Sequence, residues 1–360
     1  MRSCPISFAL VTAIVLLNGC RDDTAGSTQI TTPAPVPSLP VVAKQYDLVL
    51  YSAHSEAKIR GCLDRFQNAF PEIYVELVAL PADELLERLR AEKYEPRADL
   101  WCGVPDRFLA QAAAEGLLQK FIPAWADKVP DAYHSPDDLW YGTFISPTVI
   151  VYNRDHLAVE AAPTSLDDLM QPEWENRIVL ADPIQSEIMQ TIFGLLICRL
   201  HARDGKPDKG FDWLQRLHGN TAVYVESDKL YESLTADTPV SIWHLADVYR
   251  QQQAGTYPLG VALPVSPTPV QVEGLAVVAE APNIEASAVF YNFLTRSEIV
   301  IQANESDCIP TRVDVPADRI PAWMSQQQIT PSKVDWSLFA QNSKGWMTHW
   351  KKKIRGKQIR

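Results

Sequence analysis

The sequence predicts an α/β fold, in which β-strands alternate with α-helices along most of the 360 residues. Short apolar runs of strand length occur at 46–51, 73–78 and 98–102, and each is followed by a segment with apolar residues at helical spacing. Hydrophobic residues make up 46% of the chain and charged residues 21%, which is typical of a globular protein. This alternation predicts mostly parallel sheets flanked by helices, and the length suits two domains.

The helices of the first half are indicated by their apolar faces. The segment 56–70 places Ile59, Leu63 and Phe66 on one face, and Pro71 ends it. Further helices are expected, by the same spacing, at 82–93 and 108–116.

A second series of strands and helices follows a β-rich stretch at 141–153. Its expected elements are a short helix at 166–170, a strand at 177–181, a long helix at 186–202, a strand at 240–243 and a helix at 245–253. The chain then returns to a strand at 273–279 and to helices at 284–295 and 297–304.

Charge and hydropathy exclude two classes of protein. The formal net charge is −11, which argues against a globally basic nucleic-acid binder. No apolar run beyond the first 20 residues reaches the roughly 18 residues that a membrane-spanning helix needs, which argues against a polytopic membrane protein.

The N-terminus reads as an export signal. Arg2 supplies a positive charge, and the apolar run 8–17 is too short to span a bilayer as a mature helix. Leu17-Asn18-Gly19-Cys20 resembles the bacterial lipobox, which implies cleavage of 1–19 and lipidation of Cys20. An ordinary signal peptide with a chance cysteine is the alternative.

The segment 20–45 is a polar tether rich in proline, with no periodic apolar face. A lipid anchor, a stalk and a globular body predict a protein held on a bacterial membrane, in the periplasm or at the cell surface. The sequence leaves open whether this is the inner or the outer membrane. Within the globular body, the pairing of Cys62, Cys102, Cys198 and Cys308 also stays open, because an oxidising compartment permits disulfides without specifying them.

Short phrases along the chain carry a family resemblance. They include Ala98-Asp99-Leu100-Trp101 and the runs 115–118, 149–153, 163–169, 172–178, 181–183, 273–278 and 309–315. In this order over 46–316, they resemble type 2 periplasmic solute-binding proteins of ABC importers. More specifically, they resemble the ferric-iron-binding group of that family, which also contains phosphonate and sugar-phosphate binders.

The resemblance implies two α/β lobes, the periplasmic-binding-protein type 2 fold, with two crossover segments and a cleft that closes by a hinge on its solute. Lobe one is expected at 46–140 and 270–320, and lobe two with the hinge strands at 141–269. The C-terminal segment 321–360 is expected to be helical with a basic tail, either a solvated helix end or a membrane-surface contact. The implied partners are a small solute and the permease and ATPase subunits, and we expect a monomer without a nucleic-acid partner.

Ligands of open α/β sheets bind beyond the carboxyl ends of the strands. The candidate residues in those loops are Ser52, His54, Ser55, Thr148, Ser186, Trp243, His244 and Glu273. Ser55 and Ser186 directly precede expected helices, whose N-termini favour an anion, and an N-cap role explains both serines equally well.

Two positions bear on the identity of the solute. In ferric-binding members a histidine near the first strand-to-helix turn can coordinate the metal, which marks His54 as a metal ligand if iron is bound. A surface histidine explains it as well. Trp243-His244 stands where those members carry adjacent tyrosines, and Trp cannot ligate a metal. His244 can instead donate to a phosphate or phosphonate oxygen beside Trp243.

These observations predict a solute-binding lipoprotein that captures a small anion, a phosphate ester or a phosphonate. A ferric iron-binding protein of an iron ABC importer is the alternative, and an enzyme or a sensor subunit on the same lobes is a third. Gly-x-Ser-x-Gly, His-Glu-x-x-His and Gly-Lys-Ser/Thr motifs do not occur in the sequence. We therefore expect no enzymatic activity and no cofactor.

Overall fold

The computed structural model describes residues 47–356, except 295, 307 and 326–328. The predicted signal 1–19, the lipidation site Cys20 and the whole tether lie outside the described residues. None of the described helices is long and apolar enough to cross a membrane.

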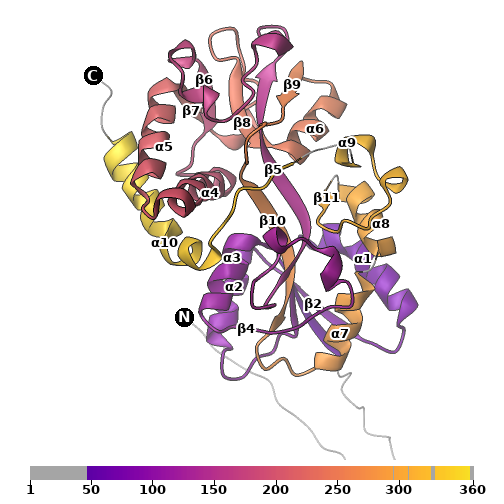
Figure 1. Ribbon diagram of the computed structural model, residues 1–360. Coiled ribbons are helices and arrows are strands. Elements are labelled where there is room, and N and C mark those ends of the chain that lie inside the picture. The colour runs from indigo at the N-terminus through magenta and orange to yellow at the C-terminus, as the bar shows by residue number, and fades with distance from the viewer. Residues whose placement is uncertain (1–46, 295, 307, 326–328, 357–360) are drawn as a thin grey trace, which may run out of the picture. The chain divides into compact units, whose positions relative to one another are not determined.

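The first sheet is built from strands that alternate with helices (Figure 1). Its main strands follow the order β2-β1-β3-β10-β5, and β1 is buried at all five positions. The strands are β1 (Leu48–Ser52), β2 (Val75–Ala79), β3 (Leu100–Pro105), β4 (Leu118–Gln119), β10 (Val270–Val278) and β11 (Ile309–Pro310). The helices that follow β1, β2 and β3 are α1 (Glu56–Ala69), α2 (Ala82–Ala91) and α3 (Asp106–Ala114).

The second sheet continues from the first through the long strand β5 (Tyr141–Asn153). The first part of β5, residues 141–147, pairs with β10, and residues 144 and 145 also pair with β11. The second part, residues 148–153, pairs with β8 and β9. The other strands of this sheet are β6 (Ile178–Ala181), β7 (Thr221–Val225), β8 (Val240–His244) and β9 (Leu259–Ala262). Its helices are α4 (Glu187–Asp204), α5 (Asp208–Asn220) and α6 (Leu245–Ala254).

The C-terminal elements contact both halves of the fold, of which the first is built around the first sheet and the second around the second sheet. They are α7 (Ile284–Phe293), α8 (Arg296–Ser306), α9 (Ala322–Ser325), α10 (Trp336–His349) and the π-helix η8 (Trp350–Arg355). Helix α10 packs on α3 and α4, and η8 packs on α5. Trp346 and Trp350, which lie among the basic residues of the tail, are buried in this packing.

Short 3₁₀ helices complete the described secondary structure. They cover Ala126–Lys128, Asp131–Tyr133, Val159–Ala161, Asp168–Met170, Pro172–Trp174, Ser227–Lys229 and Ala317–Arg319.

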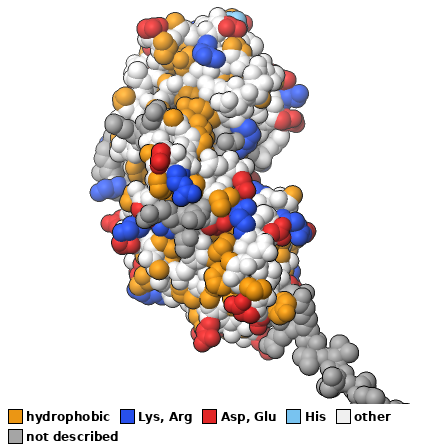
Figure 2. Space-filling model, turned by 90° about the vertical axis from the view of Figure 1, so that its right-hand side faces the viewer, with side chains coloured by type: hydrophobic (Ala, Val, Ile, Leu, Met, Phe, Trp, Pro, Cys, Tyr) orange, Lys and Arg blue, Asp and Glu red, His pale blue; other side chains and the backbone are white. Residues whose placement is uncertain are grey.

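The predicted α/β class is confirmed, and the sheets are mixed. The strands β1, β2 and β3 are parallel to one another, as are β6, β7 and β8. The long strand β5 pairs antiparallel with β10 in the first sheet and with β8 and β9 in the second, and β10 pairs antiparallel with β3 as well. On the face shown in Figure 2, basic and acidic side chains are intermixed, and no continuous basic strip of a nucleic-acid binder is seen there.

Candidate functional site

The turn between β1 and α1 is shaped by Ser52. The Ser52 side chain is fully buried, and its Oγ accepts a hydrogen bond from the His54 backbone N–H at 3.1 Å. The same hydroxyl lies 3.2 Å from the His54 carbonyl oxygen. Such local side-chain bonds stabilise turns, so Ser52 serves the geometry of the turn and thereby presents His54.

His54 contacts a carboxylate from a distant strand. Its Nε2 atom lies 2.8 Å from Oε1 of Glu273 in β10 and 2.9 Å from Nζ of Lys58 in α1. Burial disfavours the charged form of Glu273, but His54 and Lys58 outweigh it and lower the pKa of Glu273 to about 2. Glu273 is therefore a carboxylate at neutral pH.

Glu273 and Lys58 both contact the same nitrogen of His54. Nε2 of His54 must carry a hydrogen to donate to Glu273, and it must be bare to accept from Lys58. It cannot satisfy both neighbours at once. Lys58 also forms an ion pair with Glu273, with its Nζ atom 3.8 Å from Oε2.

Gly103 allows the close approach of the imidazole. This residue of β3 has a φ of +68°, and a Cβ atom built there would lie 2.9 Å from three atoms of the His54 ring. A side chain at this position is therefore excluded by both backbone conformation and space. Lys58 and Gly103 are absent from the sequence-based set of site residues. The available signals were the four-residue spacing of Lys58 from His54 and the glycine near the end of a predicted strand.

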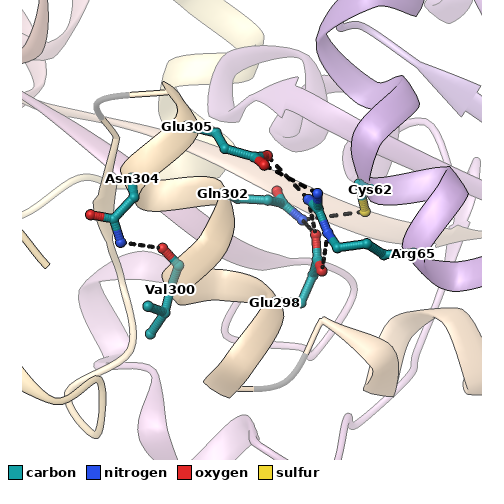
Figure 3. Close-up of polar contacts among 7 residues, drawn as sticks. All are labelled: Cys62, Arg65, Glu298, Val300, Gln302, Asn304 and Glu305. Atoms are coloured by element: carbon teal, nitrogen blue, oxygen red, sulfur yellow. Dashed lines mark hydrogen bonds and ion pairs between the residues drawn. The ribbon is translucent and has the colours of Figure 1, made fainter. Parts of the chain in front are cut away.

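A cavity of about 40 Å³ extends from this group into the first half of the fold. His54, Lys58, Gly103 and Glu273 line it together with residues from α1, β3 and α8. Part of its lining belongs to a polar network that joins α1 to α8 (Figure 3). Its members include Cys62, Arg65, Glu298, Gln302 and Glu305.

Arg65 is at the centre of that network. Its guanidinium makes bonds of 3.0 Å to each oxygen of Glu298 and of 3.1 Å to each oxygen of Glu305. The side chain of Gln302 donates to Oε1 of Glu298 at 3.0 Å and to Sγ of Cys62 at 3.3 Å. Burial, and then the Glu298 carboxylate, raise the pKa of the Cys62 thiol well above its usual range, so the thiol is neutral.

A second group of candidate residues lies on β5 and β8. Thr148 and His244 are paired across these antiparallel strands. The side-chain atoms Oγ1 of Thr148 and Nε2 of His244 are buried and have no hydrogen-bond partner among the described residues. Burial lowers the pKa of His244 to about 4, and the opposing effect of Asp247 is smaller. His244 is therefore a neutral imidazole with a free nitrogen at neutral pH.

Trp243 is held by contacts within its own half of the fold. Its Nε1 donates to Oδ2 of Asp247 at 2.8 Å, and Tyr231 donates to the same oxygen at 2.7 Å. Oδ1 of Asp247 accepts from Arg250 at 3.0 Å. The indole N–H and the Tyr231 hydroxyl are thus both engaged within the protein.

The two candidate serines differ in their surroundings. Ser55 is exposed at the start of α1, and its side chain makes no capping bond. Ser186 is buried at the start of α4, and its Oγ accepts from the Met189 backbone N–H at 3.3 Å. The capping interpretation thus describes the geometry of Ser186, and the hydroxyl of Ser55 faces solvent.

The structure therefore arranges the candidate residues in two groups. Ser52, His54 and Glu273 lie together in the first half, and Thr148 pairs with His244 between β5 and β8. The lining of the 40 Å³ cavity includes His54 and Glu273 but not Thr148 or His244. Within the described ranges, no group of three or more His, Cys, Asp or Glu side chains is placed to hold a metal ion.

Comparisons with known proteins place the chain in a family. Residues 95–330 match the family described as bacterial extracellular solute-binding protein. A probable ABC transporter periplasmic-binding protein of Sinorhizobium fredii is 24% identical over 277 residues, covering 76% of this chain and 77% of its own. Iron uptake protein A1 of Synechocystis is 28% identical over 301 residues, covering 80% and 79%.

A solved structure supports the same fold. The Trichodesmium protein in complex with iron and citrate ligands superimposes with a TM-score of 0.73 at 21% identity, covering 85% of this chain and 98% of that one. At this identity the likeness establishes the fold alone. The match over 95–330 shows that the chain belongs to the family of bacterial extracellular solute-binding proteins, which serve ABC transporters and are not enzymes.

Proposed function

We propose that this protein captures ferric iron together with a partner anion and delivers both to an ABC permease. The observation that carries the proposal is the contact of His54 with Glu273 beside Lys58. Carboxylate oxygen is a hard donor that suits ferric iron, and imidazole also binds iron. The Lys58 ammonium repels a bare cation and attracts an anion, so it favours a metal that arrives with an anionic ligand.

The similar proteins support iron over the anion alone. One of them is named as an iron uptake protein, and another was solved with iron and citrate. The phosphate-ester or phosphonate hypothesis therefore becomes the second candidate for the solute. Its specific support is Trp243, which stands where the ferric-binding members carry a tyrosine and which cannot ligate a metal.

We further propose that the Nε2 atom of His244, in the second half of the fold, donates its lone pair to the solute. The buried Nε2 atom has no partner among the described residues and is neutral, as a metal ligand or an acceptor must be. The proposed lobes, 46–140 with 270–320 against 141–269, would close on the solute by a hinge in the long strands. Closure would bring the two groups of candidate residues toward one solute.

Calorimetric titration distinguishes the two solutes. We expect the purified apoprotein to bind ferric citrate, and Glu273→Gln to weaken this binding by about tenfold or more, because a ligating carboxylate is lost. For an anion alone the sign reverses, since removing the negative charge of Glu273 strengthens binding. Ser55→Ala is the matched control, because Ser55 is an exposed neighbour without a capping bond. Tight binding of a phosphate ester or phosphonate, without retained iron, would replace the iron proposal.

The absorption spectrum provides an independent test. Tyrosinate ligands give ferric proteins a visible charge-transfer band, and here Trp243 and His244 replace the tyrosine pair. We expect the iron-loaded protein to lack that band. A coloured protein whose colour survives mild chelation would show that a tyrosine binds the metal.

We also propose that the mature protein is anchored by lipid on Cys20. The lipobox-like sequence Leu17-Asn18-Gly19-Cys20 and the tether that follows it support this proposal. The anchor would hold the solute-binding body at a bacterial membrane, close to the permease that it serves.

A further inference from the structure

The carboxylate of Asp106 is bonded to the strand that carries Glu273. Asp106 is the first residue of α3, directly after β3, and its side chain is fully buried. Its Oδ2 accepts from the backbone N–H of Val272 at 2.7 Å, and its Oδ1 accepts from the N–H of Arg107 at 2.7 Å. Val272 immediately precedes Glu273, so Asp106 holds the Gln271–Val272 peptide, one residue before the site residue.

The backbone at Glu273 is irregular and needs such support. The pairing of β10 with β5 shifts register between Glu273 and Gly274, and its pairing with β3 shifts between Gly274 and Leu275. Irregularities of this kind redirect side chains, and the ladder no longer fixes them fully. Thr143 donates from Oγ1 to the Glu273 carbonyl at 3.0 Å. Asp106 and Thr143 therefore hold the backbone on either side of the Glu273 Cα atom.

A charge in this position is costly to stability. Burial raises the pKa of Asp106 to about 7, although the N–H groups of Val272 and Arg107 oppose the rise. Arg107 itself is paired with Glu187 in α4, at 2.8 Å. The two carboxylate oxygens each accept one N–H group, whereas the amide of asparagine has a single oxygen and would leave the N–H of Val272 or of Arg107 without an acceptor.

We propose that Asp106 is a positioning residue for solute binding, which holds Val272 and thereby fixes the Glu273 carboxylate against His54. The inference rests on the proposed role of Glu273 in the site. It predicts that a substitution of Asp106 changes solute binding only by displacing Glu273.

Asp99 provides a matched control at the other end of β3. It is also fully buried, and its Oδ2 accepts from a strand N–H, that of Val49 in β1, at 2.7 Å. Its other bonds go to Asn283, at 2.7 Å from the backbone N–H and 3.1 Å from the side-chain amide. Asp99 thus has the same chemistry as Asp106, without a bond next to Glu273.

The test combines titration with ferric citrate and an NMR measurement on the apoprotein. We expect Asp106→Asn to weaken binding about tenfold, which corresponds to about 1.4 kcal/mol, and Asp99→Asn to leave it unchanged. In the Glu273→Gln background, Asp106→Asn should have no further effect. Thr143→Val, which removes the other support, should weaken binding in the same way if Asp106→Asn does not fold.

The NMR measurement needs no solute. In the apoprotein, Asp106→Asn should shift the His54 ring resonances in the same direction as Glu273→Gln does, and Asp99→Asn should not. Equal effects of the two Asp→Asn variants on binding and on His54, or additivity with Glu273→Gln, would overturn the inference. If none of the proteins binds ferric citrate, the proposed cargo fails, and the His54 resonances alone decide the role of Asp106.

Discussion

At the scale of single residues, the candidate site depends on positions whose neighbours lie far away in the sequence. His54 is presented by a local turn, but the carboxylate that it contacts comes from β10 and the space for its ring comes from Gly103. The chemistry of the site is therefore sensitive to small changes that do not touch a ligating atom.

Gly103→Ala should weaken solute binding by about tenfold, because the added methyl group displaces the His54 ring. Part of any loss of stability will come from the backbone, since a left-handed conformation costs alanine about 1–2 kcal/mol. Gly116→Ala separates the two effects: Gly116 has a φ of +67°, and a Cβ atom there meets nothing within 4 Å. Titration and thermal unfolding of both variants provide the comparison, and equal loss of binding would contradict the close-approach argument.

His244 should make stability depend on pH. Its pKa is about 4 in the folded protein, against about 6.5 in the unfolded chain. Between these values only the unfolded chain binds the proton, so stability falls as the pH drops from about 6.5 to about 4. The loss from this residue approaches about 3 kcal/mol, and His244→Gln should remove it. Denaturant unfolding of both proteins at pH 7 and pH 4.5 measures the difference, and parallel curves would mean that His244 is solvated or already protonated when folded.

At the scale of secondary-structure elements, Arg65 joins α1, which begins next to His54, to α8. Glu298 is only 3% exposed, and removal of its cation leaves a buried charge without adequate compensation. Arg65 lines the cavity, and Glu298 bonds to Arg65 and to Gln302, which also lines it. The network therefore couples the stability of α8 to the integrity of the site.

Arg65→Met should destabilise the protein by about 3–5 kcal/mol, the usual consequence of breaking a buried ion pair. Arg60→Met, on the same helix, should cost at most about 0.5 kcal/mol, because its pair with Glu56 is exposed. Adding Glu298→Gln to Arg65→Met should restore part of the loss, since the buried charge disappears. Urea denaturation of the three variants tests this order, and a small effect of Arg65→Met would show that Glu298 reaches solvent.

At the scale of the whole molecule, function requires both solute capture and a location near a permease. The family establishes an extracellular solute-binding protein that works with ABC transporter components. The lipid anchor is an additional proposal from the N-terminal sequence.

The Cys20→Ala variant should no longer incorporate labelled fatty acid and should be released from membranes, because the acceptor thiol is lost. Cys4→Ala is the control: Cys4 lies within the predicted signal peptide, so its loss should leave the label in place. Membrane fractionation with a radiolabelled or alkyne-tagged fatty acid measures both. A wild-type protein without label would contradict the anchor.

Local patterns in the sequence were sufficient for the α/β class. The apolar run at 46–51 and the helical spacing of Ile59 and Phe66 predicted β1 and α1, because burial of one face is encoded in residue spacing. Boundaries were less accurate: the helix expected at 108–116 is α3, Asp106–Ala114, where Pro105 precedes the first turn. The order of family-like phrases also led to the solute-binding family, which the match over 95–330 confirms.

Only the tertiary structure decided the surroundings of the candidate residues. The approach of Glu273 to His54, the irregular pairing of β10 and the bond from Val272 to Asp106 all depend on contacts between β10 and segments that are distant in the chain. The neutral state of His244 likewise follows from burial, which a single sequence does not reveal. Spacing along the chain determines which face of an element is apolar. The neighbours in the folded protein determine whether a side chain is charged, where it points and how much space it has.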